Sequence, residues 1–161
     1  MRRVFLAVAA LAALALSLPA AWGQAAPAPK MAVVPKDKDN DFKLYLADGR
    51  VVKGAEALGR MQGDAGLILW LAGNQFFAMD AVVQAFQKQQ PGTAVGLITL
   101  PPGLLLDAIV GGGWVFGGKE YAGLPDVYAS VNLGHLKRLK AAGLMDQHAV
   151  YMHNELEIMV G

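Results

Sequence analysis

The sequence predicts an α/β domain, built as a three-layer open parallel sheet flanked by helices. From residue 66 onward, short continuous apolar runs alternate with longer segments whose apolar residues recur at helical spacing. Clusters of glycine and proline separate these segments. Strand–helix alternation of this kind implies parallel strands that are joined by right-handed crossovers.

The first predicted unit is a strand followed by a helix. Residues 66–73 read GLILWLAG, a continuous apolar run that is typical of a strand buried on both faces. The segment 74–92 is helical, because its apolar residues share one helical face and a Pro-Gly pair stops it. The residues on that face are Phe76, Met79, Val83 and Phe86, ahead of Pro91-Gly92.

The same alternation continues to the end of the chain. Residues 93–100 (TAVGLITL) form the second strand, and 101–113 form a short helix with proline at its start and glycines at its end. After a glycine-rich loop, residues 125–130 form the third strand, and 131–143 form a helix with leucines on one face. Residues 155–161 (ELEIMVG) close the chain as a fourth strand.

The first 63 residues are not expected to belong to this sheet. Residues 1–25 have the layout of a secretory signal peptide: a basic start, an apolar run of 15 residues and small residues before a cleavage point. Residues 26–63 are expected to be a linker with a short hairpin around Asp48-Gly49. Within it, a helical turn is expected to be broken by Gly59 and Gly63.

The composition excludes several classes of partner and site. Removal of the leader takes Arg2 and Arg3 from the 14 basic residues, which leaves 12 against 13 acidic ones. A nearly neutral exported domain has no electrostatic reason to bind nucleic acid or an anionic membrane. The chain has no cysteine, so disulfides and thiolate metal sites are excluded.

Residues 113–120, GWVFGGKE, come close to the phosphate-binding loop G-x-x-x-x-G-K-[ST]. The last position is Glu120, where that loop needs a hydroxyl group for magnesium. A phosphate-binding loop also needs a helix directly after it, whereas Lys119 is followed by a turn and a predicted strand. We therefore predict no nucleotide binding here.

Neither the histidines nor Ser130 indicate a catalytic or metal site. His148 and His153 are five positions apart in the loop before the last strand, whereas a zinc site on one helix needs histidines four apart. His135 lies in a predicted helix, and all three histidines are interpreted as solvated. Ser130 has no G-x-S-x-G elbow around it. We predict no catalytic residue, no metal and no cofactor, and hence no enzyme.

Small and neutral polar residues follow three predicted strands, in the segments 72–75, 99–103 and 129–132. Ligands of open parallel sheets bind outside the carboxyl ends of the strands, and each segment leads into a helix N-terminus with free N–H groups. None of them contains Lys or Arg, which suits a small anion held by neutral donors. The candidate ligand-binding residues are Gly73, Asn74, Gln75, Thr99 and Ser130. Alternatively, Asn74, Ser130 and Asn132 are helix caps.

At these residues the chain resembles the type II periplasmic substrate-binding proteins of ABC transporters, which include the molybdate-binding proteins. The resemblance begins near residue 66 and rests on LILWLAGNQFFAMDAVVQAFQKQQPG, LPDVYASVNLGHLKRLKAAGLM and HNELEIMVG. It implies that residues 64–161 form the first lobe of a periplasmic-binding-protein-like type II fold. It also implies that the second lobe is missing from this sequence and that the closing strand is similar to the hinge strand that leaves the first lobe.

The resemblance also implies a function. The protein is expected to be a periplasmic monomer that binds a small oxyanion such as molybdate and delivers it to an ABC permease in the inner membrane. Where molybdate binders have serines after the second strand, this chain has TLPPG, so only Thr99 offers a hydroxyl group there. A second hypothesis stays open: a membrane-tethered or truncated α/β interaction module without solute-binding activity.

Overall fold

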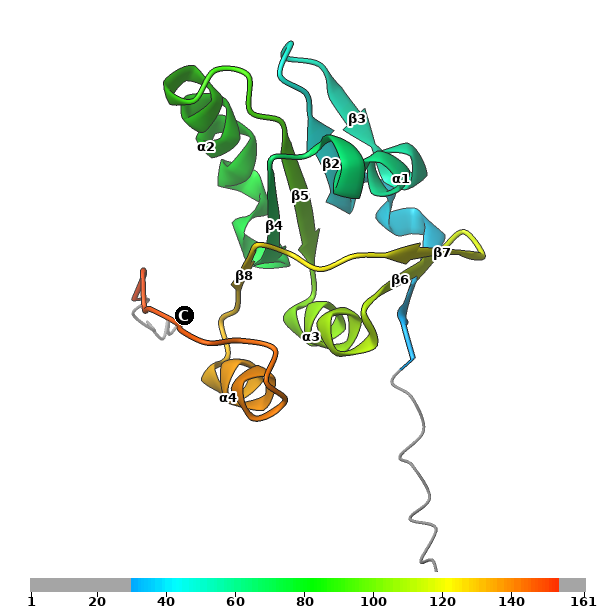
Figure 1. Cartoon of the computed structure of the whole chain (residues 1–161), viewed down its shortest axis with the longest axis vertical. Coiled ribbons are helices and arrows are strands. Elements are labelled where there is room, and N and C mark those ends of the chain that lie inside the picture. The colour runs from blue at the N-terminus through cyan, green and yellow to red at the C-terminus, as the bar shows by residue number, and fades with distance from the viewer. Residues whose placement is uncertain (1–29, 154–161) are drawn as a thin grey trace, which may run out of the picture.

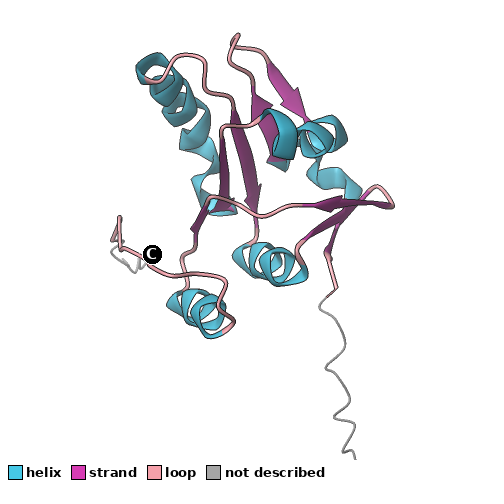
Figure 2. Ribbon diagram, in the orientation of Figure 1, coloured by secondary structure: helices cyan, strands magenta, loops and turns pink. Residues whose placement is uncertain are grey.

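The computed structural model describes residues 30–153, which form two sheets with covering helices (Figures 1 and 2). The strands are β1 (Ala32–Val34), β2 (Phe42–Tyr45), β3 (Val51–Lys53), β4 (Leu67–Ala72), β5 (Val95–Leu100), β6 (Gly113–Phe116), β7 (Lys119–Ala122) and β8 (Val127–Ala129). The α-helices are α1 (Gly54–Asp64), α2 (Phe76–Gln89), α3 (Pro102–Gly111) and α4 (Leu133–Ala141). Two short 3-10 helices are η1 (Lys36–Asp41) and η2 (Gly73–Gln75).

The larger sheet has the strand order β3-β2-β5-β4-β8. Strands β5, β4 and β8 run parallel to one another, as predicted for the three apolar runs. Strands β2 and β3 add an antiparallel hairpin beside β5. All six residues of β5 are buried, because the strand lies at the centre of the sheet and helices cover both faces. The α/β class is therefore confirmed, with a mixed sheet in place of a purely parallel one.

Two apolar cores lie on opposite faces of this sheet. On one face, Met79 and Val83 of α2 pack with Leu71 and Leu97. On the other face, α1 and α3 pack over Trp70 and the alternate residues of the neighbouring strands. Figure 1 shows α2 on one side of the strands and α1 on the other, with α3 below the ends of β4 and β5. The order helix, sheet, helix gives the three layers that the sequence predicts.

The smaller sheet explains the glycine-rich stretch 113–120. Strands β6 and β7 pair antiparallel, with Phe116 opposite Lys119, so Gly117 and Gly118 alone form the turn. Their φ angles are 60° and 81°, and a two-residue hairpin turn with positive φ at both positions favours glycine. Strand β1 pairs with β6 in parallel and completes this sheet. The turn joins two strands, so no helix follows Lys119, in agreement with the prediction.

The linker predicted over residues 26–63 is wrong for its described part. Residues 32–64 contain β1, η1, β2, β3 and α1, and they contribute to the main core. Phe42 and Leu44 of β2 are completely buried. The predicted hairpin around Asp48-Gly49 is present, but its strand β2 pairs with the sequence-distant β5, which a local reading of the sequence does not show.

Helix α1 runs without a break through Gly59 and Gly63, in contrast to the predicted interrupted turn. A glycine inside a helix costs about 1 kcal/mol relative to alanine. Both glycines lie on the exposed side, while Ala57, Leu58 and Met61 bury the opposite side against the sheet. Tertiary packing of one face therefore outweighs the local cost of two glycines.

Two predicted segments lie outside the described residues: the signal peptide over residues 1–25 and the closing strand over 155–161. Between residues 30 and 153, no helix combines the length and the apolar character that crossing a membrane requires.

Candidate ligand site at the ends of β4 and β8

The parallel pair β4 and β8 brings two of the predicted segments together. Leu71 of β4 lies opposite Ala129 of β8, so both strands end at the same edge of the sheet. The chain enters η2 and then α2 directly after β4, and it reaches Ser130 directly after β8. Gln75 and Ser130, which are far apart in the sequence, consequently line the same cavities.

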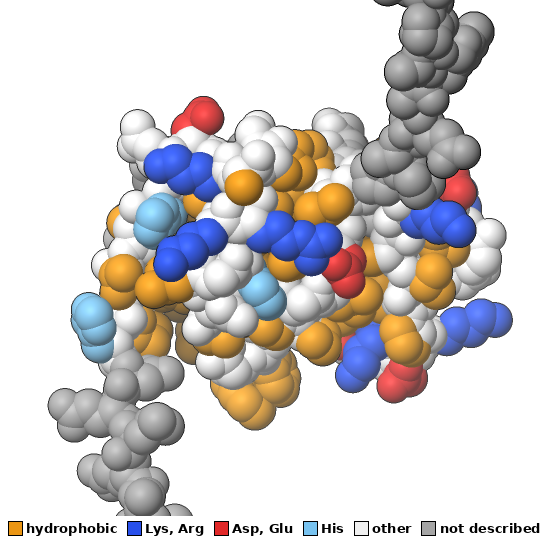
Figure 3. Space-filling model, turned by 90° about the horizontal axis from the view of Figure 1, so that it is seen from below, with side chains coloured by type: hydrophobic (Ala, Val, Ile, Leu, Met, Phe, Trp, Pro, Cys, Tyr) orange, Lys and Arg blue, Asp and Glu red, His pale blue; other side chains and the backbone are white. Residues whose placement is uncertain are grey.

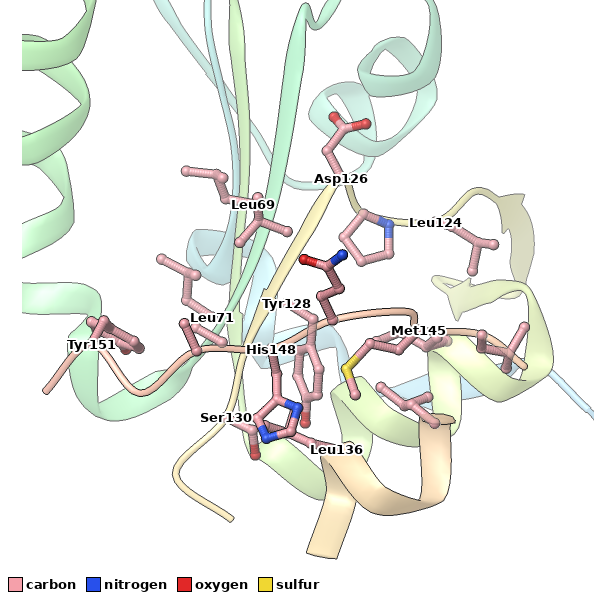
Figure 4. A pocket seen from close by; sticks show the side chains of 18 of the residues that line it. Leu69, Leu71, Leu124, Asp126, Tyr128, Ser130, Leu136, Met145, His148 and Tyr151 are labelled. Atoms are coloured by element: carbon pink, nitrogen blue, oxygen red, sulfur yellow. The ribbon is translucent and has the colours of Figure 1, made fainter. Parts of the chain in front are cut away.

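Two adjoining cavities occupy this edge of the sheet. The smaller has a volume of about 370 Å³ and is lined by residues of the two strand-end loops, of α4 and of the segment 149–153. The larger has a volume of about 670 Å³ and extends along β8 (Figure 4). Figure 4 shows Asp126 at one end of the larger cavity and Ser130 toward the other. The residues shared by both cavities are Gln75, Ser130, Leu136, Ala149 and Tyr151.

The Ser130 hydroxyl group is held by hydrogen bonds to its own loop and to α4. Its oxygen accepts a hydrogen bond from the backbone N–H of Asn132 at 3.1 Å. Nδ1 of His135 lies 3.3 Å from the same oxygen. Asn132 is the N-cap of α4, since its Oδ1 accepts from the Gly134 N–H at 2.8 Å. The cap interpretation is thus confirmed for Asn132, whereas Ser130 lines the cavities.

Gln75 and Asn74 stand at the start of α2. Asn74 is exposed and lines the smaller cavity. The Gln75 side chain donates a hydrogen bond from Nε2 to Oη of Tyr151, so it does not cap the helix. No side chain caps the first turn of α2. Within this turn the Phe76 N–H donates to the carbonyl oxygen of Gly73 in η2, whereas the N–H groups at a helix start generally lack a partner inside their own helix.

Thr99 is the predicted site residue that lies apart from the others. It is buried, with 5 % of its surface exposed, and it lines neither cavity. It lies beside the carboxyl of Asp41, which precedes β2. Burial raises the pKa of Asp41 above the ordinary value, since desolvation outweighs the lowering effects of Lys38 and of Thr99. Gly73 lies near the backbone of Leu100, at the end of β5.

The lining of both cavities carries no lysine or arginine. Its one carboxylate, Asp126, accepts a hydrogen bond from the Ile68 N–H at 2.7 Å and so serves the sheet. The basic residues of α4 stand on the outer surface, where Figure 3 shows Lys and Arg side chains among apolar ones. One of them, Arg138, lies 3.7 Å from Asp107 of α3.

The residues described here contain no group of three or more His, Asp or Glu side chains that would hold a metal ion. His148 lines the larger cavity and His153 the smaller one. His135 is half-buried between Ser130 and Tyr128, so the solvated interpretation is wrong for this histidine. The sequence offered one signal for it: His135 stands in the first turn of a helix, and Ser130 lies in the loop directly before that helix.

An apolar cavity with a few convergent polar groups, at the carboxyl ends of parallel strands, is the usual form of a small-ligand site in an α/β domain. The chain belongs to the bacterial extracellular solute-binding proteins, because the sequence model of that family matches residues 67–161. No curated protein and no solved structure gives a significant match.

The family match begins at β4, so it contains both cavities and the two strand-end loops. An extracellular solute-binding protein captures a small solute and delivers it to a membrane transporter for ABC uptake. Such proteins are generally not enzymes. The resemblance drawn from the sequence is therefore confirmed at the level of the solute-binding class.

Proposed function

We propose that this chain is the first lobe of a periplasmic solute-binding protein and that its solute is a small oxyanion such as molybdate. The observation that supports the proposal is the convergence of Gln75 and Ser130 on shared cavities at the ends of β4 and β8. The proposed donors are Asn74, Gln75, Ser130 and the backbone N–H groups that follow Gly73. Thr99, the remaining predicted residue, is buried and lines neither cavity.

The chemistry of the lining favours an anion that is held without a full counter-charge. The first turn of α2 has no side-chain cap, and the positive end of its helix dipole lies beside the smaller cavity, which Asn74 and Gln75 line. Amide and hydroxyl groups of Asn74, Gln75 and Ser130 add neutral donors. A small oxyanion has several acceptor oxygens and matches such a set.

The rim of the smaller cavity supports a second lobe as the partner of this one. Apolar side chains are exposed around it: Val131 (61 %), Leu133 (56 %), Val150 (60 %) and Met152 (61 %). Phe77, at the start of α2, is 82 % exposed. Exposed apolar groups of this kind mark a surface that another domain or partner covers. We propose that a second lobe covers it and encloses the solute.

The same rim favours the alternative function, an α/β interaction module that binds a protein partner and no solute. For the solute-binding function, we propose that residues 1–25 act as a signal peptide and that a monomer docks on an ABC permease. Expression with the leader should then yield a periplasmic product that begins near residue 24 or 26. A membrane-bound product that keeps its leader would favour the tethered module.

Calorimetric titration of the full chain with molybdate, tungstate and sulfate tests the solute directly. Removing a donor to a charged ligand costs roughly 1.5–3 kcal/mol, so Ser130→Ala should weaken anion binding by about tenfold or more. Gln75→Ala should weaken anion binding for the same reason. Gln84→Ala is its matched control, because Gln84 is exposed on α2 outside both cavities. Absence of heat with all three anions, or equal affinity in Ser130→Ala, would refute the oxyanion proposal.

A further inference from the structure

Two hydroxyl groups converge on a single ring nitrogen of His135. Ser130 Oγ and Tyr128 Oη each lie 3.3 Å from Nδ1. Tyr128 belongs to β8 and His135 to the first turn of α4, so this contact joins the strand to the helix that follows it. Both hydroxyl-bearing residues line the larger cavity, and Ser130 lines the smaller one as well.

The protons of these groups can be assigned by counting donors. A tyrosine hydroxyl group has one proton, and Tyr128 donates it to the carbonyl oxygen of Pro102 at 3.0 Å. Tyr128 Oη therefore faces His135 as an acceptor. Ser130 Oγ already accepts from the Asn132 N–H, and its own proton has two protein acceptors, Nδ1 of His135 and the Asn132 carbonyl at 3.4 Å.

The state of Nδ1 thus decides where the Ser130 proton points. When Nδ1 carries no proton, it accepts the Ser130 hydroxyl proton and turns it away from the cavity. When Nδ1 carries a proton, it donates to Tyr128 Oη, which continues to donate to Pro102. Ser130 then loses Nδ1 as an acceptor, and a ligand has to compete only with the long contact to the Asn132 carbonyl oxygen at 3.4 Å for the Ser130 proton. Acidification enforces the second state, since both nitrogens of a protonated imidazole are donors.

We propose that His135 is a positioning residue that couples anion binding to pH by releasing the Ser130 hydroxyl group as a donor. The inference rests on the proposed oxyanion function of the same site. Histidine changes its charge between about pH 5 and pH 8, so solute affinity should increase as the pH falls through this range. A periplasmic protein meets the external pH directly, which makes such coupling effective.

Other titratable or charged groups stand around His135 and are included in the test. Its own helix carries basic residues on its outer surface, and one of them lies beside Asp107 of α3. Strand β8 contributes Tyr128, which contacts the His135 ring. The segment after α4 contributes His148, which lines the larger cavity together with Tyr128. The basic residues of α4 are Lys137, Arg138 and Lys140. Lysine and arginine keep their charge over this pH range, so His148 is the group that must be separated from His135.

The experiment measures molybdate affinity of the full chain at about pH 8 and about pH 6, where an ordinary histidine changes its charge. For wild type we expect about tenfold tighter binding or more at the lower pH, as for one added hydrogen bond to a charged ligand. His135→Asn keeps a polar group near the Nδ1 position but cannot titrate, so its affinity should not change with pH. His148→Asn, the control, should keep the wild-type pH dependence.

Ser130→Ala separates the hydroxyl mechanism from simple attraction by a charged ring. If His135 acts through Ser130, the variant binds weakly at both pH values; a preserved pH dependence in this variant would overturn the proposal. Wild-type binding that is equal at both pH values would overturn it while leaving the oxyanion function intact. No binding at either pH would overturn both.

Wild type alone supplies a check that needs no substitution. Coupling between two binding events is reciprocal, so saturating molybdate should move the midpoint of the His135 ring resonance to higher pH in an NMR titration. A midpoint that molybdate leaves unchanged would overturn the proposal even if a variant failed to fold.

Discussion

Gln75 and Tyr151 are joined by a hydrogen bond from Nε2 to Oη, although 76 positions separate them in the chain. This bond ties the segment after α4 to the last residue of η2, directly before α2. Both residues line both cavities, and the tyrosine hydroxyl group occupies a side-chain donor of Gln75. If Gln75 binds the solute, as proposed, Tyr151 competes with that solute for this donor.

Replacement of Tyr151 by phenylalanine should strengthen anion binding. The change removes the competing acceptor but keeps the ring, so Gln75 becomes free to donate to the solute. An intramolecular hydrogen bond contributes roughly 0.5–1.5 kcal/mol, so we expect affinity for molybdate to rise by about twofold to tenfold in calorimetry. Tyr121→Phe is the control, because Tyr121 contacts Lys119 through its ring and lies outside both cavities. Weaker binding in Tyr151→Phe would instead make Tyr151 part of the ligand site.

The N-terminal residues should be required for folding. Phe42 is completely buried and packs on Trp114 and Phe116 with ring-centroid distances of 5.9 and 5.1 Å. Phe42→Ala should therefore lower the free energy of unfolding by about 3–5 kcal/mol, as measured by urea denaturation. Val33→Ala, at a position that is 70 % exposed, should change it by less than about 0.5 kcal/mol. A negligible effect of Phe42→Ala would restore the interpretation of this region as a linker.

Asp80 should contribute stability that is lost in acid. Hydrogen bonds from Lys43 Nζ and Tyr45 Oη lower the pKa of Asp80, since both favour the ionised carboxylate. A carboxyl whose folded pKa lies below its unfolded pKa stabilises the fold above the unfolded value and loses this contribution as the pH falls through the folded value. Burial and the neighbouring Asp80 raise the pKa of Tyr45, so the tyrosine remains a donor at neutral pH.

Asp80→Asn should consequently reduce the free energy of unfolding by roughly 1 kcal/mol near pH 7, since the pair is partly exposed and screened. The difference from wild type should shrink in acid, at a pH below the ordinary pKa of an aspartate, because the carboxyl group of Asp80 then becomes protonated. Urea denaturation at neutral pH and over a series of acidic pH values measures it. Asp107→Asn, in the exposed contact with Arg138 at 3.7 Å, is the control with an expected effect near zero. A difference that does not depend on pH would exclude the charge-based explanation.

A side chain at the Gly117-Gly118 turn should lower the stability of the fold. Gly118 has a φ of +81° and open space around it, so Gly118→Ala tests the backbone conformation alone. The left-handed conformation costs an L-residue about 1–2 kcal/mol, which thermal melting should detect as lost stability. Gly103→Ala is the matched control: it also has open space, but it lies in α3 and should be neutral or stabilising. Equal effects of the two changes would contradict the hairpin turn.

The sequence by itself determined the parallel half of the large sheet and the helices that connect it. Leu67–Ala72 and Val95–Leu100 are continuous apolar runs, and strands buried on both faces need no other signal. Helical spacing similarly predicted α2 and α4. The alternation of strands and helices also predicted that the loops with Gln75 and Ser130 lie at one edge of the sheet, because parallel strands place their carboxyl ends together.

Only the tertiary structure decided which distant residues meet. The pairing of β1 with β6, the burial of Phe42 and the continuity of α1 through two glycines depend on contacts that no local pattern encodes. The same holds for the bond between Gln75 and Tyr151 and for the position of His135 beside Ser130. Apolar periodicity reports which face of an element is buried, but it carries no information on the side chain that lies opposite, because that choice belongs to the packing of the whole chain.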